Sequence, residues 1–259
     1  MSSTTAAAAV PMDTSVVSVL AAGDCNDSRR TATISPTATT TATTTTAATT
    51  TISSTTTAAA GGVNNGSGDG ISRVSVRRAA LSEACSVTSM VNDASRHNTA
   101  LFAVEGFTRV TPDGTQVEAL MGNPCSAFLV AEEKNVDGSS SVMVGCIHVN
   151  WSGTTVSKDP SVDAHIGFLS VPEQYSGRGI GTLLLSTAEE WCRRELGRQD
   201  FVVELTVLSI FPRLCVWYKT LGYETGKIIP FPTPGKVRKG IDLKLQLMTK
   251  TCVPPAGLG

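Results

Sequence analysis

The residues best suited to chemistry lie in a short stretch, residues 174–182, in which Gly177, Gly179 and Gly181 alternate with other residues. Glycine has no Cβ atom and adopts positive φ readily, so such a stretch lets a ligand approach the backbone closely. A run of apolar residues precedes the stretch (166–171), and apolar residues at helical spacing follow it. The sequence therefore predicts a strand, a glycine turn and a helix whose first backbone amides are free to bind an anion such as phosphate.

The spacing of the glycines excludes three common nucleotide-binding loops. The dinucleotide fingerprint G-x-G-x-x-G requires a glycine where Thr182 stands. A P-loop requires a lysine followed by serine or threonine directly after its last glycine, and here Thr182 follows Gly181 with no lysine between them. A protein kinase would also need His-Arg-Asp and Asp-Phe-Gly motifs, and the chain contains neither.

The spacing does match the Q/R-x-x-G-x-G/A signature of the GNAT superfamily of N-acetyltransferases, at Gln174, Gly177 and Gly179. The chain resembles that family over residues 71–250, because further segments occur in the family's order. These segments are Arg77-Arg78-Ala79 with the helix after it, a strand at 142–149 that holds Val144-Gly145, a strand at 201–209, and a helix running from Trp217 through Tyr218 to Gly222 and Tyr223.

The resemblance implies an α/β (α+β) sandwich. It consists of a mixed, mostly antiparallel central sheet of six to seven strands, flanked by about four helices. Members of this family usually have a bulge in the fourth strand, which splays it from the fifth and opens a cleft between them. Periodicity and turn residues predict the elements independently. Strands are expected at 71–77, 127–132, 142–151, 164–171, 201–209, 224–230 and 241–249, and helices after Ser82, near 100–108, from the glycine stretch to Gly197, and from Pro212 to Gly222.

Composition divides the chain into three parts. Residues 31–60 are almost wholly Thr, Ala and Ser, and residues 61–70 are mainly Gly, Asn, Ser and Asp. Such segments have too little large apolar surface to offset the entropy of ordering a backbone. The sequence therefore predicts a disordered region at 1–70, an N-acetyltransferase domain at 71–250 and a flexible tail at 251–259.

Charge and cysteine usage exclude several classes of function. The net charge is −1, so nothing draws the whole molecule toward nucleic acid or an anionic membrane. No apolar run approaches the roughly 20 residues of a membrane-spanning helix. The seven cysteines form no C-x-x-C pair and do not combine with His97, His148 or His165 at ligand spacing, so no metal site is expected. Scattered cysteines in odd number favour a reducing compartment, the cytoplasm, with the nucleus as an alternative.

The resemblance implies that acetyl-CoA is the cosubstrate. The backbone of Leu169, Ser170 and Val171 is expected to contact the pantetheine arm as an added strand would. The glycine stretch is expected to hold the pyrophosphate with backbone amides and with the Arg178 guanidinium. The residues assigned to this second role are Gln174, Ser176, Gly177, Arg178, Gly179, Ile180, Gly181 and Thr182.

Acyl transfer to an amine requires a base for the amine and a proton for the departing thiolate. The resemblance places Tyr218 where the family's tyrosine protonates the thiolate of coenzyme A. Three residues remain open as the general base: His165 at the start of the fourth strand, Glu204 within the apolar fifth strand, and Asp163 beside His165.

The chain departs from the family pattern at Phe211 and Leu214, where the family often has asparagine and alanine before the tyrosine, and at Ser176, which replaces a common basic residue. The predicted activity is acetyl transfer to a primary amine by direct attack in a ternary complex. The alternative is a catalytically inactive module of the same fold that binds coenzyme A. The acceptor, a small molecule or a peptide amine, and the oligomeric state remain open. The final loop is basic and favours an acidic or neutral acceptor over a polyamine; its basic residues are Lys227, Lys236, Arg238 and Lys239.

Overall fold

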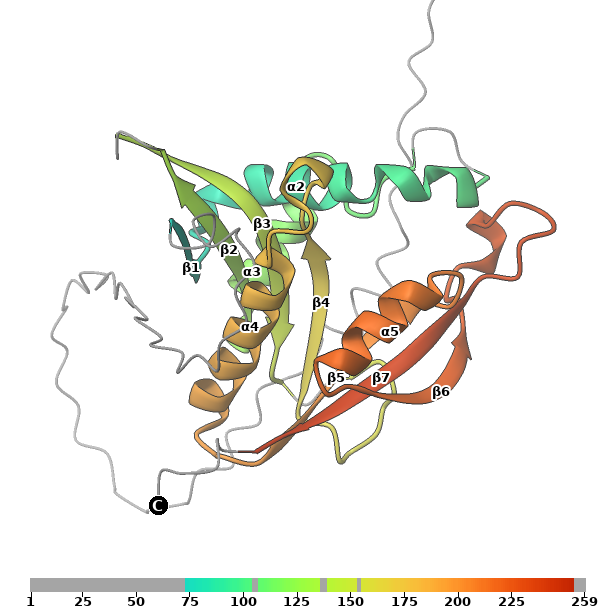
Figure 1. The fold of residues 1–259 in the computed structure, drawn as a ribbon. Helices are drawn as coiled ribbons and strands as arrows, with labels where there is room; N and C mark the ends of the chain where they lie inside the picture. The colour runs from blue at the N-terminus through green and yellow to red at the C-terminus, as the bar shows by residue number, and fades with distance from the viewer. Residues whose placement is uncertain (1–72, 104–106, 136–138, 153–154, 254–259) are drawn as a thin grey trace, which may run out of the picture.

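A seven-stranded sheet forms the centre of the computed structural model, which describes residues 73–103, 107–135, 139–152 and 155–253 (Figure 1). The strand order is β1-β2-β3-β4-β5-β7-β6. The strands are β1 (Val74–Arg78), β2 (Ser126–Lys134), β3 (Ser141–Asn150), β4 (Ala164–Ser170), β5 (Phe201–Leu208), β6 (Glu224–Pro230) and β7 (Lys244–Cys252). The α-helices are α2 (Ala84–Ala94), α3 (Thr115–Gly122), α4 (Ile180–Leu196) and α5 (Pro212–Thr220).

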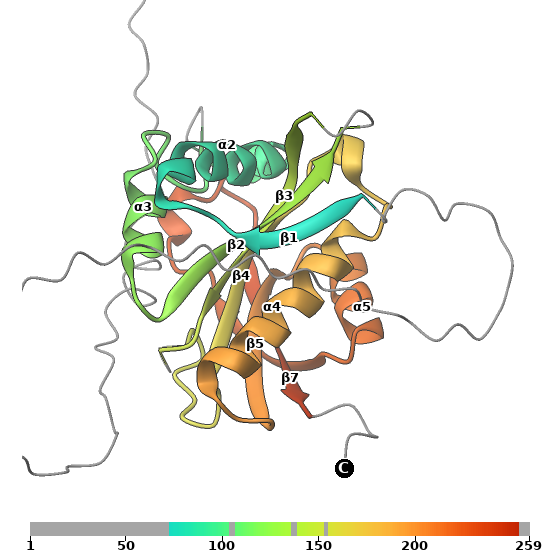
Figure 2. The same ribbon diagram turned by 90° about the vertical axis from the view of Figure 1, so that its left-hand side faces the viewer.

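Helices cover both faces of the sheet (Figures 1 and 2). On one face, α4 packs Leu184, Leu185 and Ala188 against inward residues of the central strands, such as Ile147 and Ile166. On the other face, α2 and α3 pack against the opposite side of β2 and β3. The side chains alternate between these two cores because successive residues of a strand point to opposite faces. The predicted α/β sandwich with a mixed sheet is therefore confirmed.

A bulge in β4 separates the sheet into two parts. Cys146 of β3 pairs with Ser170 and His148 pairs with Gly167, so β4 has one extra residue between these pairs. Phe168 lies at this position with a positive φ of 50°. Beyond the bulge, β4 no longer pairs with β5, its neighbour on the other side from β3. The parallel pairing of β4 with β5 is confined to Ala164–Val203 and His165–Glu204 within the described strands. The predicted splay is confirmed.

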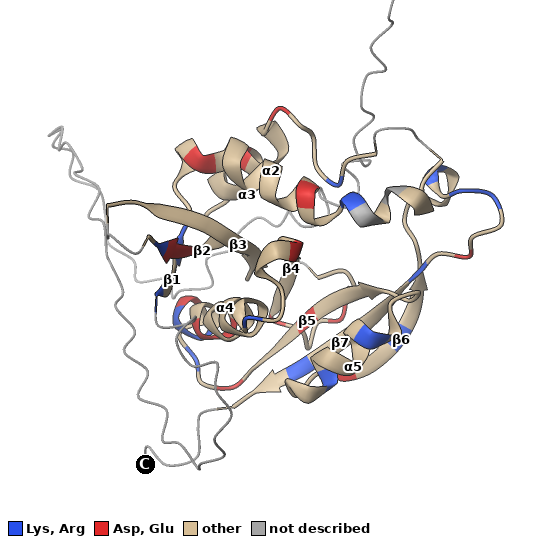
Figure 3. Ribbon diagram, turned by 45° about the horizontal axis from the view of Figure 1, so that its top comes forward, with Lys and Arg blue, Asp and Glu red and all other residues tan. Residues whose placement is uncertain are grey.

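A second, smaller apolar cluster lies at the start of β7. Phe102 and Phe107 pack there with Phe231 and Leu243, which flank the loop between β6 and β7. The loop is tied to this segment by a backbone bridge between Phe102 and Val237. Figure 3 shows Lys and Arg residues on this loop and on α5. The basic loop predicted from the sequence is thus part of the packed fold.

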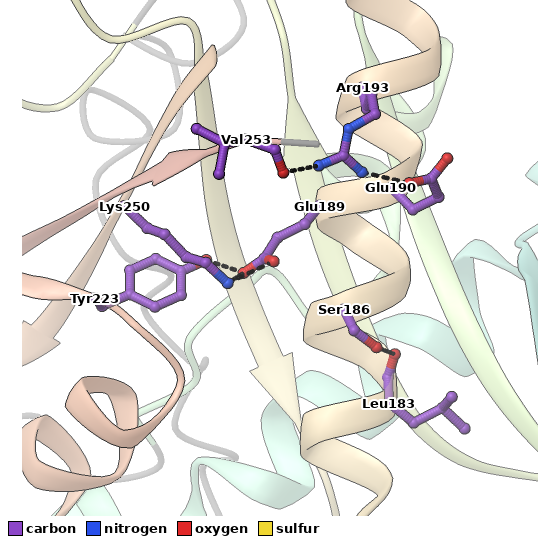
Figure 4. A network of polar contacts seen from close by, with 8 residues as sticks. All are labelled: Leu183, Ser186, Glu189, Glu190, Arg193, Tyr223, Lys250 and Val253. Carbon is purple, nitrogen blue, oxygen red and sulfur yellow. Dashed lines mark hydrogen bonds and ion pairs between the residues drawn. The ribbon is translucent and has the colours of Figure 1, made fainter. Parts of the chain in front are cut away.

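A polar network joins the two parts of the sheet behind the splay (Figure 4). Lys250 of β7 donates to both carboxylate oxygens of Glu189 on α4, at 2.9 and 2.7 Å. The Tyr223 hydroxyl donates to the same carboxylate at 3.0 Å. Because α4 rests on β2, β3 and β4 while β7 pairs with β5, this network fastens one part of the sheet to the other.

Two element predictions need correction, and one helix was not predicted. The helix expected near 100–108 is absent from the described part of that range, where a short 3-10 turn, Arg96–Leu101, ends. The helix of this region is α3, whose eight residues carry too few apolar repeats to stand out in the sequence. The last strand begins at Lys244 rather than at residue 241 and extends to Cys252, because it pairs with the whole length of β5.

The predicted disordered region, residues 1–70, lies outside the described residues. The predicted flexible tail, residues 251–259, is wrong for its first two residues, which belong to β7, and residues 254–259 are not described. Among the described residues, no helix is both long and apolar enough to cross a bilayer.

The packing of α4 on β3 leads to a first prediction, for Gly145. A Cβ atom at this position would lie 3.0 Å from the Leu184 side chain and 3.1 Å from the Ser170 carbonyl oxygen. We expect Gly145→Ala to lower the free energy of unfolding by ~1–3 kcal/mol, as overpacking does. Gly122→Ala is the control, because a Cβ there meets nothing within 4 Å. Urea unfolding of both variants measures the difference, and equal stabilities would contradict the close approach of α4 to β3.

Candidate functional site

The first turn of α4 presents unused backbone donors. Gly177 and Gly179 have positive φ values of 74° and 79°, and Gly179 precedes the helix without any side-chain cap. The Leu183 amide donates to the Gly179 carbonyl at 3.0 Å. Within the described residues, no backbone carbonyl accepts from the amides of Gly177 and of residues 179–182, which precede Leu183. The helix therefore starts with free N–H groups and the positive end of its dipole.

A pocket with a volume of about 470 Å³ lies in front of these donors. Its walls come from the end of β4, the glycine stretch, the first turn of α4 and one face of α5. The lining residues are Leu169, Val171, Tyr175, Ser176, Gly177, Gly179, Ile180, Gly181, Thr182, Leu214 and Trp217. Most of the residues predicted to bind a phosphate-bearing ligand are thus brought together around one cavity.

Gln174, Ser170 and Arg178 from the same prediction do not line this pocket. The Ser170 hydroxyl is buried and donates to the Phe168 carbonyl at 3.0 Å. The Arg178 guanidinium forms an ion pair with Glu133 at the end of β2, with one hydrogen bond of 3.1 Å. This pair holds the pKa of the Glu133 carboxyl below its ordinary value. Much of the Arg178 charge is therefore balanced within the protein.

Sequence reasoning missed the apolar wall that α5 contributes. Leu214 and Trp217 both line the pocket, and a Cβ atom at Gly181 would lie 3.6 Å from the Trp217 ring. The two residues are three positions apart and share one face of the helix. That spacing was visible in the sequence, but only the fold shows that this face turns toward the start of α4.

Tyr218 lies beside this wall and is almost fully buried. Its ring contacts Trp217 and Tyr223, with centroids 4.7 and 5.6 Å apart. Burial raises the pKa of Tyr218 to about 12, although the positive charge of Arg109 acts in the opposite direction. The hydroxyl is therefore protonated at neutral pH and can serve as an acid.

His165 lies on the face of β4 opposite α4, where it is 4% exposed. Neither ring nitrogen has a hydrogen-bond partner among the described residues. Burial lowers the pKa of His165 to about 4, and the Arg109 charge adds to this effect. The imidazole is thus neutral at pH 7, with a lone pair that accepts from no donor in the described part of the chain.

The two carboxylates predicted as alternative bases both accept hydrogen bonds from backbone amides of other segments. Glu204 is fully buried and accepts hydrogen bonds from the amides of Val156 and Ser157. Burial raises its pKa above the ordinary value, against the effect of these hydrogen bonds. Asp163 accepts from the Val202 amide at 2.7 Å and pairs with Arg198. The described residues contain no group of three His, Cys, Asp or Glu side chains that could hold a metal ion.

Comparison with known proteins agrees with this geometry. A family model described as the acetyltransferase (GNAT) family matches residues 90–223, about half of the chain. Among curated proteins, a search returned no match.

Solved structures share the fold at low sequence identity. The protein yncA from Salmonella typhimurium, solved with its cofactor acetyl-CoA, is 21% identical, with a TM-score of 0.50 over 72% of this chain and 98% of that chain. A phosphinothricin acetyltransferase from Sinorhizobium meliloti in complex with AcCoA is 15% identical, with a TM-score of 0.51 over 71% and 91% of the two chains. A spermidine N-acetyltransferase from Vibrio cholerae, in complex with CoA and spermine, is 12% identical, with a TM-score of 0.50 over 70% and 96%.

The burial of His165 leads to a prediction about stability and pH. Its pKa is lower in the folded chain than the ordinary 6.5, so the unfolded chain takes up a proton first as the pH falls. The neutral His165 side chain therefore contributes fully to the free energy of unfolding above pH 6.5. This contribution, roughly 3 kcal/mol, is lost as the pH falls toward 4. We expect His165→Gln to lose less stability over this range than the unmodified chain. Urea unfolding between pH 7 and 4 measures this, and parallel curves for both proteins would contradict it.

Proposed function

The chain belongs to the acetyltransferase (GNAT) family, and we propose that it transfers the acetyl group of acetyl-CoA to a primary amine of a small molecule or a peptide. The observation that carries this proposal is the uncapped start of α4, with free amides at Gly177 and at residues 179–182, all of which line a pocket. Such amides suit the two negative charges of a pyrophosphate. The similar structures solved with acetyl-CoA support the same assignment.

The pantetheine arm would follow the exposed edge of β4. Past the bulge, none of the described strands pairs with this edge, because β5 has diverged. Leu169 and Val171 line the pocket there, and Leu214 and Trp217 face them from α5. An extended chain of amide groups between these walls would bond to the β4 backbone as an added strand does.

The acetyl transfer would proceed by direct attack. The amine nitrogen forms a bond to the thioester carbonyl carbon, and the carbon–sulfur bond then breaks. The leaving thiolate takes the proton of the Tyr218 hydroxyl, which is held by burial in its protonated form. We assign the proton of the amine to His165 rather than to Glu204, because the Glu204 oxygens already accept from backbone amides.

One observation favours the alternative, a module that binds coenzyme A without catalysis. The carboxylates of Glu204 and Asp163 are engaged in structural contacts, and the lowered pKa of His165 makes it a weak base. Binding and turnover therefore have to be measured separately.

Binding is tested at the glycine stretch with two matched substitutions. Gly177 and Gly197 lie near opposite ends of α4, both with positive φ, and a Cβ at either meets nothing within 4 Å. We expect Gly177→Ala and Gly197→Ala each to cost ~1–2 kcal/mol of stability. Only Gly177→Ala should weaken acetyl-CoA binding, by about tenfold or more, because it disturbs the charge-assisted bonds of the amides. Isothermal titration calorimetry with acetyl-CoA measures this, and equal affinity of the two variants would refute the pyrophosphate assignment.

Catalysis is tested at Tyr218. We expect Tyr218→Phe to keep the ring packing and the affinity for acetyl-CoA, and to lower turnover by about 10²- to 10⁴-fold, the usual range for a general acid. Tyr223→Phe is the control, since it removes only the hydrogen bond to Glu189 and should lower stability alone. The measurement is release of free coenzyme A with a panel of primary amines. Acetyl-CoA binding with no turnover of any amine would instead support the inactive module.

A further inference from the structure

Arg109 places a guanidinium inside the fold, close to the residues assigned to catalysis. The residue as a whole is partly exposed, yet its charged end is desolvated enough that the pKa of the guanidinium is lowered from its ordinary value. It acts electrostatically on His165 and on the Tyr218 hydroxyl. No sequence pattern pointed to this residue, which lies between the 3-10 turn Arg96–Leu101 and α3 in a segment without periodicity.

The position of Arg109 is fixed by two contacts. Its backbone amide donates to the Asn92 side chain at 2.9 Å, and the neighbouring Val110 exchanges two hydrogen bonds with the same side chain. The guanidinium carbon lies 4.8 Å from the centre of the Phe168 ring. Phe168 is the residue at the bulge of β4, so the cation is held beside the opening of the sheet.

Within the described residues, no carboxylate pairs with the Arg109 guanidinium. The groups that favour its charge are the Tyr218 hydroxyl and the Cys146 thiol. Both are neutral at pH 7, because burial raises each pKa to about 12. A guanidinium removed from water without an anion is costly, and proteins rarely leave such a group uncompensated.

The surroundings of Arg109 contain further unsatisfied polar atoms. Both ring nitrogens of His165 and the Nδ1 atom of His148 lack partners among the described residues, and both side chains are at least nine-tenths buried. His148 uses its other nitrogen in a hydrogen bond of 2.7 Å with Ser126. Two histidines and a guanidinium therefore lie in this region, and the described part of the chain supplies no acidic partner for them.

We infer that the acceptor carries a carboxylate beside its amine, and that the Arg109 guanidinium binds this carboxylate. The acceptor class is therefore an amino acid or a short peptide with a free carboxyl group. This inference rests on the proposed function, because it names the substrate of the same site. A guanidinium binds a carboxylate through two parallel hydrogen bonds, so it also orients the molecule.

The same arrangement disfavours a polyamine. A polyamine would bring ammonium groups toward a fixed cation, where like charges repel in a medium of low dielectric constant. The buried carboxylate of Glu204, which pairs with His165 across β4 and β5, already accepts from backbone amides. A bound carboxylate would in addition offset the Arg109 charge that lowers the pKa of His165, which makes the imidazole a better base.

The test compares matched acceptors with the full chain: α-amino acids, their primary amides, the amines that lack the carboxyl carbon, and spermidine. We expect the acids to exceed the other three in kcat/KM by at least about tenfold, the effect of a charge-assisted hydrogen bond. Arg109→Gln should abolish this preference and leave acetyl-CoA affinity unchanged, while Arg109→Lys should restore part of it. Arg194→Gln is the control, because Arg194 also lies over an aromatic ring, that of Trp191.

The possible outcomes separate this inference from the proposed function. If the unmodified protein binds acetyl-CoA but serves amides or amines as well as acids, or acetylates no acid, the inference is overturned and the proposed function stands on its other tests. If it binds no acetyl-CoA, both are overturned. A preference for acids that survives Arg109→Gln would assign the carboxylate to another residue and would also overturn the inference.

Discussion

The structure depends on one irregularity, the extra residue of β4 at Phe168. A regular β4 would continue its parallel ladder with β5 and close the sheet. The bulge ends that pairing after His165–Glu204, so no described strand pairs with this edge of the rest of β4, which lies beside the pocket. It also turns the Phe168 ring toward Arg109. The opening, the ligand edge and the buried cation thus have a common origin. The Glu189–Lys250–Tyr223 network keeps the two parts of the sheet together behind this opening.

Electrostatics divides the site into two ends. At one end, backbone amides and a helix dipole supply positive potential without a side-chain charge, since Arg178 is balanced by Glu133. At the other end, the charge is a single guanidinium on an aromatic ring. Both ends favour anions. The positive charge of Arg109, at the second end, acts on the Tyr218 hydroxyl. A donor with a pyrophosphate and an acceptor with a carboxylate fit this distribution of charge.

Much of the site could be predicted because its residues are adjacent in the chain. Residues 177–182 form a local motif. The positive φ values of Gly177 and Gly179 and the free amides of residues 179–182 follow from glycine chemistry and helix geometry. Trp217 and Arg109 could not be assigned in this way. Trp217 reaches the pocket only because α5 packs beside the start of α4, and Arg109 follows a segment without a repeat. The roles of Glu204 and Asp163 were equally hidden, because their partners are backbone amides of other segments.

The sequence by itself determined the strands, the glycine turn and the long helix after it, because periodicity and glycine content act over a few neighbouring residues. It also indicated the family, since the motifs follow one another in a recognisable order. Tertiary structure alone decided which charged side chains are neutralised within the protein and which remain able to bind a ligand. Whether a carboxylate or guanidinium is neutralised depends on contacts between residues far apart in the chain, as for Arg178 with Glu133, and on burial, as for Arg109. Burial and long-range pairing are properties of the folded chain, and no local pattern encodes them.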